Sequence, residues 1–268
     1  MDRRRLGRSD LMVAPIGFGA VKIGRNQGVK YPRAYALPDS HAVERLLHGV
    51  LDAGINLIDT APAYGSSEAL IGRHLAHRRS EIVLATKVGE QFADGRSSFD
   101  FSAAGMRRSI EQSLRALCTD AVDILLLHSD GRDLDILTQT DAVAVLLDAR
   151  ARGLARAVGL SGKTVAGARA ALAWADVLML TYNLEDRSHA AVLEEARAAG
   201  VGVLVKKALG AGQLDAAAAI GFATAPAAVG AAVIGSLSVA HMRENLAAAA
   251  SAAPAHACGA SHRETSHA

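Results

Sequence analysis

The stretch INLIDTAPAYG, residues 55–65, joins a short apolar run to a polar loop. The run at 55–58 is followed at once by Asp59, and Tyr64 lies five residues further along the loop. Short apolar runs bounded by turn-forming residues are typical of buried strands. This stretch therefore predicts a strand whose end carries polar side chains.

Similar runs recur along the whole chain, and each is followed by a segment with helical periodicity. They lie at 16–18, 82–85, 124–127, 157–160, 177–180, 201–205 and 231–234. Most are continuous in Val, Ile and Leu, as expected for parallel strands that are covered on both faces. The alternation predicts an α/β protein, a (β/α)8 TIM barrel. An open doubly wound sheet is the alternative, but no Gly-rich turn follows the first strand.

Three helices carry recognisable start signals. Asp39 and Ser102 are expected N-caps, and Ser188 is expected to open a third helix that ends before Gly200. The apolar pattern of the second helix also places Cys118 in the core.

The domain organisation is expected to be simple, because no Pro/Gly/Ser-rich linker interrupts the alternation. Residues 1–252 are predicted to form a single barrel, with an N-terminal β-hairpin within 4–13 that covers its floor. The segment 253–268 is small, polar and dotted with histidines, and we expect it to be disordered.

Composition narrows the function classes. Half of the residues are hydrophobic, and 29 Lys and Arg balance 27 Asp and Glu to a net charge of +2. This favours a globular core and argues against a nucleic-acid surface. No signal peptide or membrane-spanning run is found, so a cytoplasmic protein without a membrane partner is expected. The residues predict no metal site, and the oligomeric state is expected to be a monomer or a small homo-oligomer.

Four polar side chains fall at or just after the ends of predicted strands, where the active sites of TIM barrels lie. They are Asp59, Tyr64, Lys87 and His128. Reduction of a carbonyl needs a proton donor at the oxygen, and tyrosine, with a pKa of about 10, is a poor acid at neutral pH. A neighbouring Lys87 ammonium lowers that pKa, Asp59 keeps the ammonium charged, and His128 orients the carbonyl or passes the proton.

Each residue also has a plainer interpretation. Asp59 is also compatible with capping a helix or a turn. Tyr64 is compatible with a structural role in a loop, and His128 with a place in the core. Lys87 is also compatible with a different kind of catalysis, in which a lysine forms a Schiff base with a carbonyl substrate. The four together, at neighbouring strand ends, favour the catalytic interpretation.

These motifs resemble those of the aldo-keto reductase family over nearly the whole chain. RLGRS (5–9) with IGFG (16–19) is similar to its hairpin and first strand, and residues 56–65 to its signature. ATK (85–87) and LLH (126–128) are similar to its other two catalytic motifs. The resemblance implies that Asp59, Tyr64, Lys87 and His128 are the catalytic tetrad, with Tyr64 as the acid.

The resemblance also implies a nicotinamide cofactor, with NADP(H) preferred and NAD(H) as the alternative. The implied cofactor-binding residues are Ser161, Gly162, Lys206, Leu209, Gly210, Gly212, Gly235, Ser236, His241, Glu244 and Asn245. Three positions at the expected nicotinamide site depart from the family pattern. Gly162 replaces an asparagine, Met179 a glutamine, and the segment around Lys206 a tyrosine that stacks on the nicotinamide.

The predicted function is NAD(P)H-dependent reduction of aldehydes or ketones to alcohols, with a small carbonyl or alcohol compound as substrate. A cofactor-binding, redox-sensing regulatory subunit without significant turnover is the first alternative. A Schiff-base lyase acting through Lys87 and a metal-dependent hydrolase are the others. The loops at 25–38 and 89–100, with Tyr31, Tyr35, Phe92 and Phe99, are candidates for a substrate pocket wall.

Overall fold

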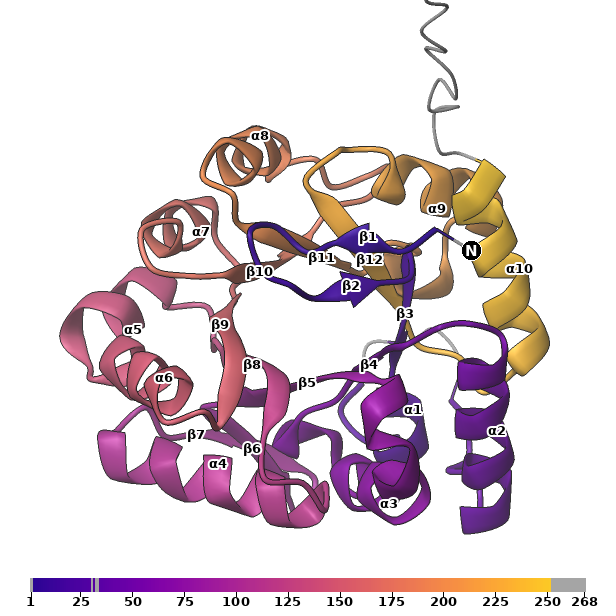
Figure 1. Cartoon of the computed structure of the whole chain (residues 1–268), viewed down its shortest axis with the longest axis horizontal. Coiled ribbons are helices and arrows are strands. Elements are labelled where there is room, and N and C mark those ends of the chain that lie inside the picture. Colours follow the sequence, from indigo (N-terminus) through magenta and orange to yellow (C-terminus); the bar gives the residue numbers. More distant parts are fainter. Residues whose placement is uncertain (1, 30, 32–33, 252–268) are drawn as a thin grey trace, which may run out of the picture.

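Eight parallel strands close into a barrel in the computed structural model, which describes residues 2–29, 31 and 34–251. The strand order around the barrel is β10-β11-β12-β3-β4-β5-β8-β9 (Figure 1). The strands are β3 (Ile16–Gly19), β4 (Leu57–Asp59), β5 (Val83–Val88), β8 (Val122–His128), β9 (Ala155–Ser161), β10 (Val177–Thr181), β11 (Gly202–Lys206) and β12 (Val229–Ile234). The predicted TIM barrel is confirmed, and each predicted strand is present with shifted ends.

Helices cover the outside of the barrel (Figure 1). They are α1 (Val21–Gly24), α2 (Ser40–Asp52), α3 (Ser67–Leu75), α4 (Ala103–Ala116), α5 (Asp133–Gln139), α6 (Ala142–Ala151), α7 (Val165–Ala171), α8 (Ala190–Ala198), α9 (Ala216–Thr224) and α10 (Val239–Ser251). Three 3-10 turns are η1 (Pro62–Tyr64), η2 (Ala76–Glu81) and η3 (Gly210–Gly212). Among the described residues, none of the helices is long and apolar enough to cross a membrane.

Two helix starts agree with their capping signals, and the third predicted helix, α8, is present but begins two residues after Ser188. The side chains of Asp39 and Ser102 accept hydrogen bonds from Ala42 N and Gly105 N at the starts of α2 and α4. Ser188 does not cap α8, because its hydroxyl instead bonds the Asp186 carboxylate at 2.6 Å.

The core placement of Cys118 is also wrong. The side chain is exposed because α4 ends at Ala116, so the helical periodicity does not continue to this residue. Cys118 lies in the turn that follows, with φ at +53°.

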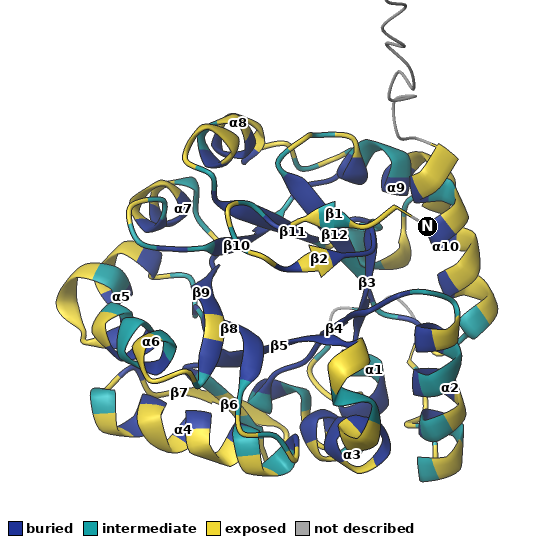
Figure 2. Ribbon diagram, viewed as in Figure 1, coloured by how far each residue is buried: buried dark blue, intermediate teal, exposed yellow. Residues whose placement is uncertain are grey.

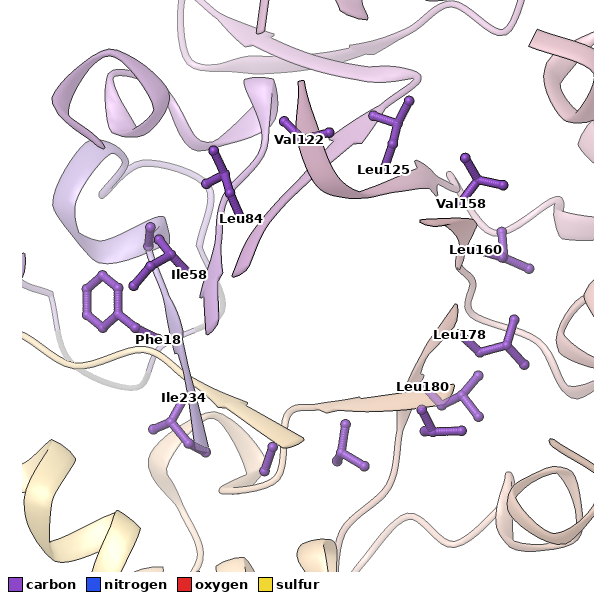
Figure 3. Packing of buried hydrophobic residues seen from close by; sticks show 14 of the residues in the cluster. Phe18, Ile58, Leu84, Val122, Leu125, Val158, Leu160, Leu178, Leu180 and Ile234 are labelled. Atoms are coloured by element: carbon purple, nitrogen blue, oxygen red, sulfur yellow. The ribbon is translucent and has the colours of Figure 1, made fainter. Parts of the chain in front are cut away.

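Two layers of apolar side chains hold the fold together. The outer layer lies between the strands and the helices, and Figure 3 shows its members, such as Leu84, Leu125 and Val158, pointing away from the barrel axis. The inner layer includes Leu57, Val83, Ala85, Ile124, Leu126, Ala157, Met179, Leu204 and Ala231. Figure 2 shows the barrel strands almost wholly buried, with the exposed residues on the outer faces of the helices.

A two-stranded hairpin covers the N-terminal end of the barrel, as predicted. It pairs β1 (Arg4–Arg5) with β2 (Met12–Val13). Leu6 in its loop is fully buried against the inner layer. A Cβ atom at Gly202 or Gly230 would lie 2.6 or 2.7 Å from the Leu6 side chain, so these two glycines leave the space that Leu6 fills.

A second hairpin occupies the segment after β5 that was predicted to be a loop. It pairs β6 (Glu90–Ala93) with β7 (Arg96–Phe99) through the two-residue turn Asp94–Gly95. Both turn residues have positive φ, +50° and +76°, as a tight hairpin turn requires. The predicted tail at 253–268 lies outside the described residues.

We expect Leu6→Ala to destabilise the protein by roughly 2–5 kcal/mol, because the deletion leaves a cavity in the barrel floor. Met12→Ala is the matched control, since Met12 lies in the same hairpin but is 42% exposed. Chemical denaturation of both variants measures the difference. Equal midpoints for the two variants would contradict a packing role for Leu6.

Candidate active site

The alternation of side chains along the strands decides which residues enter the barrel. On β5, Val83 and Ala85 belong to the inner layer and Leu84 to the outer one. Successive side chains of a strand point to opposite faces, so Lys87 points inward. The same alternation on β4 and β8 turns Asp59 and His128 inward. All three lie at the C-terminal ends of their strands, so they meet at one end of the barrel.

Strands β9 and β11 add two further polar side chains at the same end. Ser161 is the last residue of β9 and pairs in register with His128. Lys206 is the last residue of β11, and it follows the inner residue Leu204 by two positions. Lys206 Nζ donates hydrogen bonds to Ser161 Oγ at 3.0 Å and to the Gly162 carbonyl at 2.7 Å.

A buried ion pair lies at the centre of the site. Lys87 Nζ donates to Asp59 Oδ1 at 2.7 Å and to the Thr60 carbonyl at 2.9 Å. Burial alone lowers the pKa of Lys87, but Asp59 and Tyr64 outweigh it, so the pKa lies above its usual value. Burial raises the pKa of Asp59 and Lys87 opposes that rise. The two side chains thus form a buried ion pair.

Tyr64 lies beside this pair at the end of η1. Lys87 Nζ is 4.7 Å from the centre of the Tyr64 ring, and the His128 ring meets it edge-on at 6.2 Å. Burial raises the pKa of Tyr64, and Lys87 opposes this only in part. Lys87 therefore acts in the expected direction, although the net pKa lies above its usual value rather than below it. The phenol keeps its proton at neutral pH, as a proton donor requires.

His128 contacts an acidic residue that sequence reasoning did not single out. His128 Nδ1 lies 2.9 Å from Glu90 Oε2, although the two atoms are not aligned as a hydrogen bond. Burial lowers the pKa of His128 to about 4 against the opposing influence of Glu90. Burial would raise the pKa of Glu90, but His128, Ser97 and Arg25 bring it to about 2. At neutral pH Glu90 is ionised and His128 is neutral.

Arg25 connects the segments around Tyr64 and Glu90. Its guanidinium donates to the Ala63 carbonyl at 2.9 Å and lies 4.0 Å from Glu90 Oε1. The same group stacks on the Phe92 ring at 3.6 Å from the ring centre. One side chain thus holds η1 and the β6–β7 hairpin together.

Two connected cavities open above these residues. The smaller one, about 460 Å³, is lined by Asp59, Tyr64, His128, Ser161 and Lys206. The larger one, about 730 Å³, begins at Tyr64 and runs past β12 to α10. They share six lining residues, Val21, Tyr31, Tyr64, Lys207, Val233 and Gly235. Together they form one extended site, with Tyr64 where the two cavities join.

Most of the residues predicted to bind a cofactor line these cavities. Ser161, Lys206 and Gly235 line the smaller one, and Leu209, Gly212, Gly235, Ser236, His241, Glu244 and Asn245 line the larger one. Gly162 and Gly210 line neither, although the Gly162 carbonyl binds Lys206.

Two features of the cavities suit a dinucleotide with polar groups. His189 Nε2 is buried without a hydrogen-bond partner among the described residues, and His189 lines the smaller cavity. Gly212, with φ at +91°, has no atom within 4 Å of an added Cβ, so its backbone is open to a ligand. The residues present therefore fit the cofactor that the resemblance implies.

Sequence reasoning missed Glu90, Arg25, Lys163 and His189, which all line the two cavities. Of the four loop aromatics proposed as a pocket wall, Tyr31 lines both cavities, whereas Tyr35, Phe92 and Phe99 line neither. Phe92 serves instead as the stacking partner of Arg25, and the Tyr35 hydroxyl bonds the Arg25 carbonyl.

Comparison with known proteins shows the family to which this chain belongs. The family model described as "Aldo/keto reductase family" matches residues 15–218. An aldo-keto reductase structure from Pseudomonas aeruginosa is 45% identical, with a TM-score of 0.86, and covers 93% of this chain and 95% of that one. A holo-form aldo-keto reductase from Bacillus halodurans is 25% identical, with a TM-score of 0.79, over 92% and 90% of the two chains. The chain belongs to the aldo/keto reductase family.

Curated relatives carry oxidoreductase names. L-galactose dehydrogenase of Arabidopsis thaliana is 32% identical over 80% of this chain and 67% of its own length. 6-Dehydroglucose reductase of Novosphingobium aromaticivorans is 35% identical over 60% of this chain. An uncharacterised oxidoreductase of Bacillus subtilis is 30% identical, also over 60% of the chain. The matches span about half the length of these last two relatives, 51% and 49%.

We expect Asp59→Asn to destabilise the protein by roughly 3–5 kcal/mol, because it leaves the Lys87 charge buried without its partner. Asp52→Asn is the matched control, since Asp52 also pairs with a cation, Arg78 at 3.0 Å, but is largely exposed. Its stability should stay close to that of the wild type. Denaturant unfolding at pH 7 compares the two, and a similar loss in both would argue against an ionised Asp59–Lys87 pair.

Proposed function

We propose that the protein is an NAD(P)-dependent oxidoreductase that reduces aldehydes or ketones to alcohols. The observation that carries the proposal is the position of Tyr64, beside the Lys87 ammonium and facing His128, where the two cavities join. A carbonyl oxygen bound there meets a protonated phenol. The family membership and the oxidoreductase names of the relatives support the same chemistry.

Tyr64 donates the proton in this proposal. As negative charge develops on the carbonyl oxygen, the phenol hydrogen moves to it and a phenolate remains. The Lys87 ammonium, 4.7 Å from the ring, stabilises that phenolate. Asp59 keeps Lys87 charged and fixed in position through the 2.7 Å contact.

His128 faces Tyr64 across the proposed carbonyl position as a neutral imidazole. Its pKa of about 4 leaves it uncharged at physiological pH, so it orients the substrate without competing with Tyr64 as the acid. Glu90 at Nδ1 favours the proton on that nitrogen, and the carboxylate also fixes the orientation of the ring.

The cofactor would be held along the two cavities. Ser161 and Lys206 lie nearest to Tyr64, Leu209 and Gly212 follow, and Ser236, His241, Glu244 and Asn245 form the far end. A bound nicotinamide supplies the hydride. NADP(H) is the proposed cofactor and NAD(H) the alternative, because His241 is the one described basic side chain that lines the far end of the larger cavity beside Glu244 and Asn245.

Hydroxylated aldehydes are the proposed substrates. Arg25, Glu90 and Ser97 line the larger cavity near Tyr64 and offer charged and polar partners to hydroxyl groups. The names of the Arabidopsis and Novosphingobium relatives refer to sugars, which agrees with this polarity.

We expect Tyr64→Phe to lower kcat by roughly 10²–10⁴-fold, because the proton donor is lost. Tyr182→Phe is the matched control, since Tyr182 is buried, stacks on Phe222 and lines neither cavity. Absorbance of NADPH and NADH with a panel of sugar aldehydes and simple aldehydes measures turnover. Cofactor affinity should be nearly equal in the wild type and both variants.

The outcomes separate the proposed enzyme from its first alternative. Cofactor binding without turnover in the wild type would favour a redox-sensing regulatory subunit. Full activity in Tyr64→Phe would exclude Tyr64 as the acid, and the absence of binding of either nucleotide would overturn the proposal.

We expect His241→Ala to weaken NADPH binding by roughly threefold to tenfold and to leave NADH binding unchanged, because only NADPH carries the 2′-phosphate that the imidazole side chain would bind. His41→Ala is the control, since His41 is exposed on α2 and lines neither cavity. Fluorescence titration of both nucleotides measures the two affinities. An equal loss for NADPH and NADH would place the 2′-phosphate elsewhere.

A further inference from the structure

The smaller cavity contains a second lysine, Lys206, which differs from Lys87 in its surroundings. Lys87 is paired with a carboxylate at 2.7 Å, whereas Lys206 binds only neutral groups, the Ser161 hydroxyl and the Gly162 carbonyl. Among the described residues, no carboxylate oxygen lies within 4 Å of Lys206 Nζ. The cavity therefore holds a positive charge that no neighbouring anion neutralises.

Charged and titratable groups face Lys206 from every element around it. They are Asp59 on β4, Lys87 on β5, His128 on β8, Asp133 on α5, Lys163 after β9, Asp186 and His189 before α8, and Lys207 after β11. Burial lowers the pKa of Lys206 to about 7, with Lys87, Lys207 and Lys163 adding to the effect and Asp133 opposing it. Lys206 thus changes its charge near neutral pH.

The position of this charge matters for the proposed cofactor. Hydride transfer requires the nicotinamide ring to reach a carbonyl whose oxygen lies between Tyr64 and His128. Both residues line the same cavity as Lys206. The oxidised ring carries a positive charge and the reduced ring carries none, so a cation in this cavity penalises only the oxidised form.

We propose that Lys206 makes the site discriminate between the two oxidation states of its nicotinamide, binding the reduced form more tightly while the ammonium is protonated. The inference rests on the proposed function and extends it to the cofactor form that occupies the site. While Lys206 is protonated, the reduced form occupies the site in preference to the oxidised form, and the oxidised form is released readily.

The pH dependence has a definite sign. Below about pH 7 Lys206 is charged. The dissociation constant of the oxidised cofactor divided by that of the reduced cofactor is then high. Above that pH the amine is neutral and the ratio falls. By linkage, binding of the oxidised form near pH 7 releases a proton from Lys206, whereas binding of the reduced form does not.

The test is a set of titrations of both oxidation states of NADP and of NAD at pH 6 and pH 9, by calorimetry or fluorescence. The titrations compare the wild type with the Lys206→Met and Lys206→Arg variants. In the wild type we expect the ratio of dissociation constants to be roughly tenfold higher at pH 6 than at pH 9, because only the protonated Lys206 repels the positively charged oxidised ring. Lys206→Arg should keep the high ratio at both pH values, and Lys206→Met the low ratio at both.

Lys163→Met is the matched control. Lys163 lines the same cavity, but it is exposed and its Nζ binds the Asp130 carbonyl. Its loss should change the ratio less than twofold and shift the pH dependence only slightly, because water screens an exposed charge and Lys163 is the smallest of the named contributions to the pKa of Lys206. A larger effect of Lys163→Met than of Lys206→Met would overturn the assignment.

The remaining outcomes test the inference about Lys206 and the proposed function separately. A Lys206→Met variant that is folded by circular dichroism and keeps the wild-type ratio at pH 6 would overturn the inference. So would a Lys206→Arg variant that loses discrimination at pH 6. Equal binding of both forms by the wild type at pH 6 would overturn the inference and leave the proposed reductase standing. Binding of neither form would overturn the proposed function itself.

Discussion

The pleat of a closed parallel barrel is the constraint on which the rest of the structure depends. Closure leaves no free edge, so every strand must present the same alternation of inner and outer side chains to its neighbours. Because all eight strands run in the same direction, their last inner residues converge at one end. Asp59, Lys87, His128, Ser161 and Lys206 occupy such positions. The Asp59–Lys87 pair and the second lysine follow from this geometry, and the burial that shifts their pKa values follows from barrel closure.

Much of the fold could be predicted from local signals. The eight apolar runs and two of the helix caps, Asp39 and Ser102, depend on short stretches of chain, and the structure contains them. The β6–β7 hairpin was missed although Asp94–Gly95 is a strong hairpin signal, because its strands are mostly exposed and lack an apolar pattern. Cys118 was misplaced because periodicity alone does not show where a helix ends.

Only part of the candidate site could be predicted from the sequence. Its members on the barrel strands could be predicted, because the end of a strand is visible in the sequence and the barrel brings such ends together. Glu90 and His189 could not, because they reach the cavities from a hairpin and a loop whose positions depend on distant contacts. The net rise in the pKa of Tyr64 was also beyond sequence reasoning, since it results from a balance between burial and charge.

Arg25 has a consequence for how this barrel can change its loops. Its guanidinium contacts Ala63, Glu90 and Phe92, which belong to two different crossovers of the barrel. Arg25 joins these segments in addition to the direct contacts between β6 and η1. A graft that exchanges the β6–β7 hairpin for that of another barrel would free the guanidinium and loosen the turn that carries Tyr64. The loops of a TIM barrel can usually be exchanged one at a time. In this barrel the two crossovers must be exchanged or redesigned together.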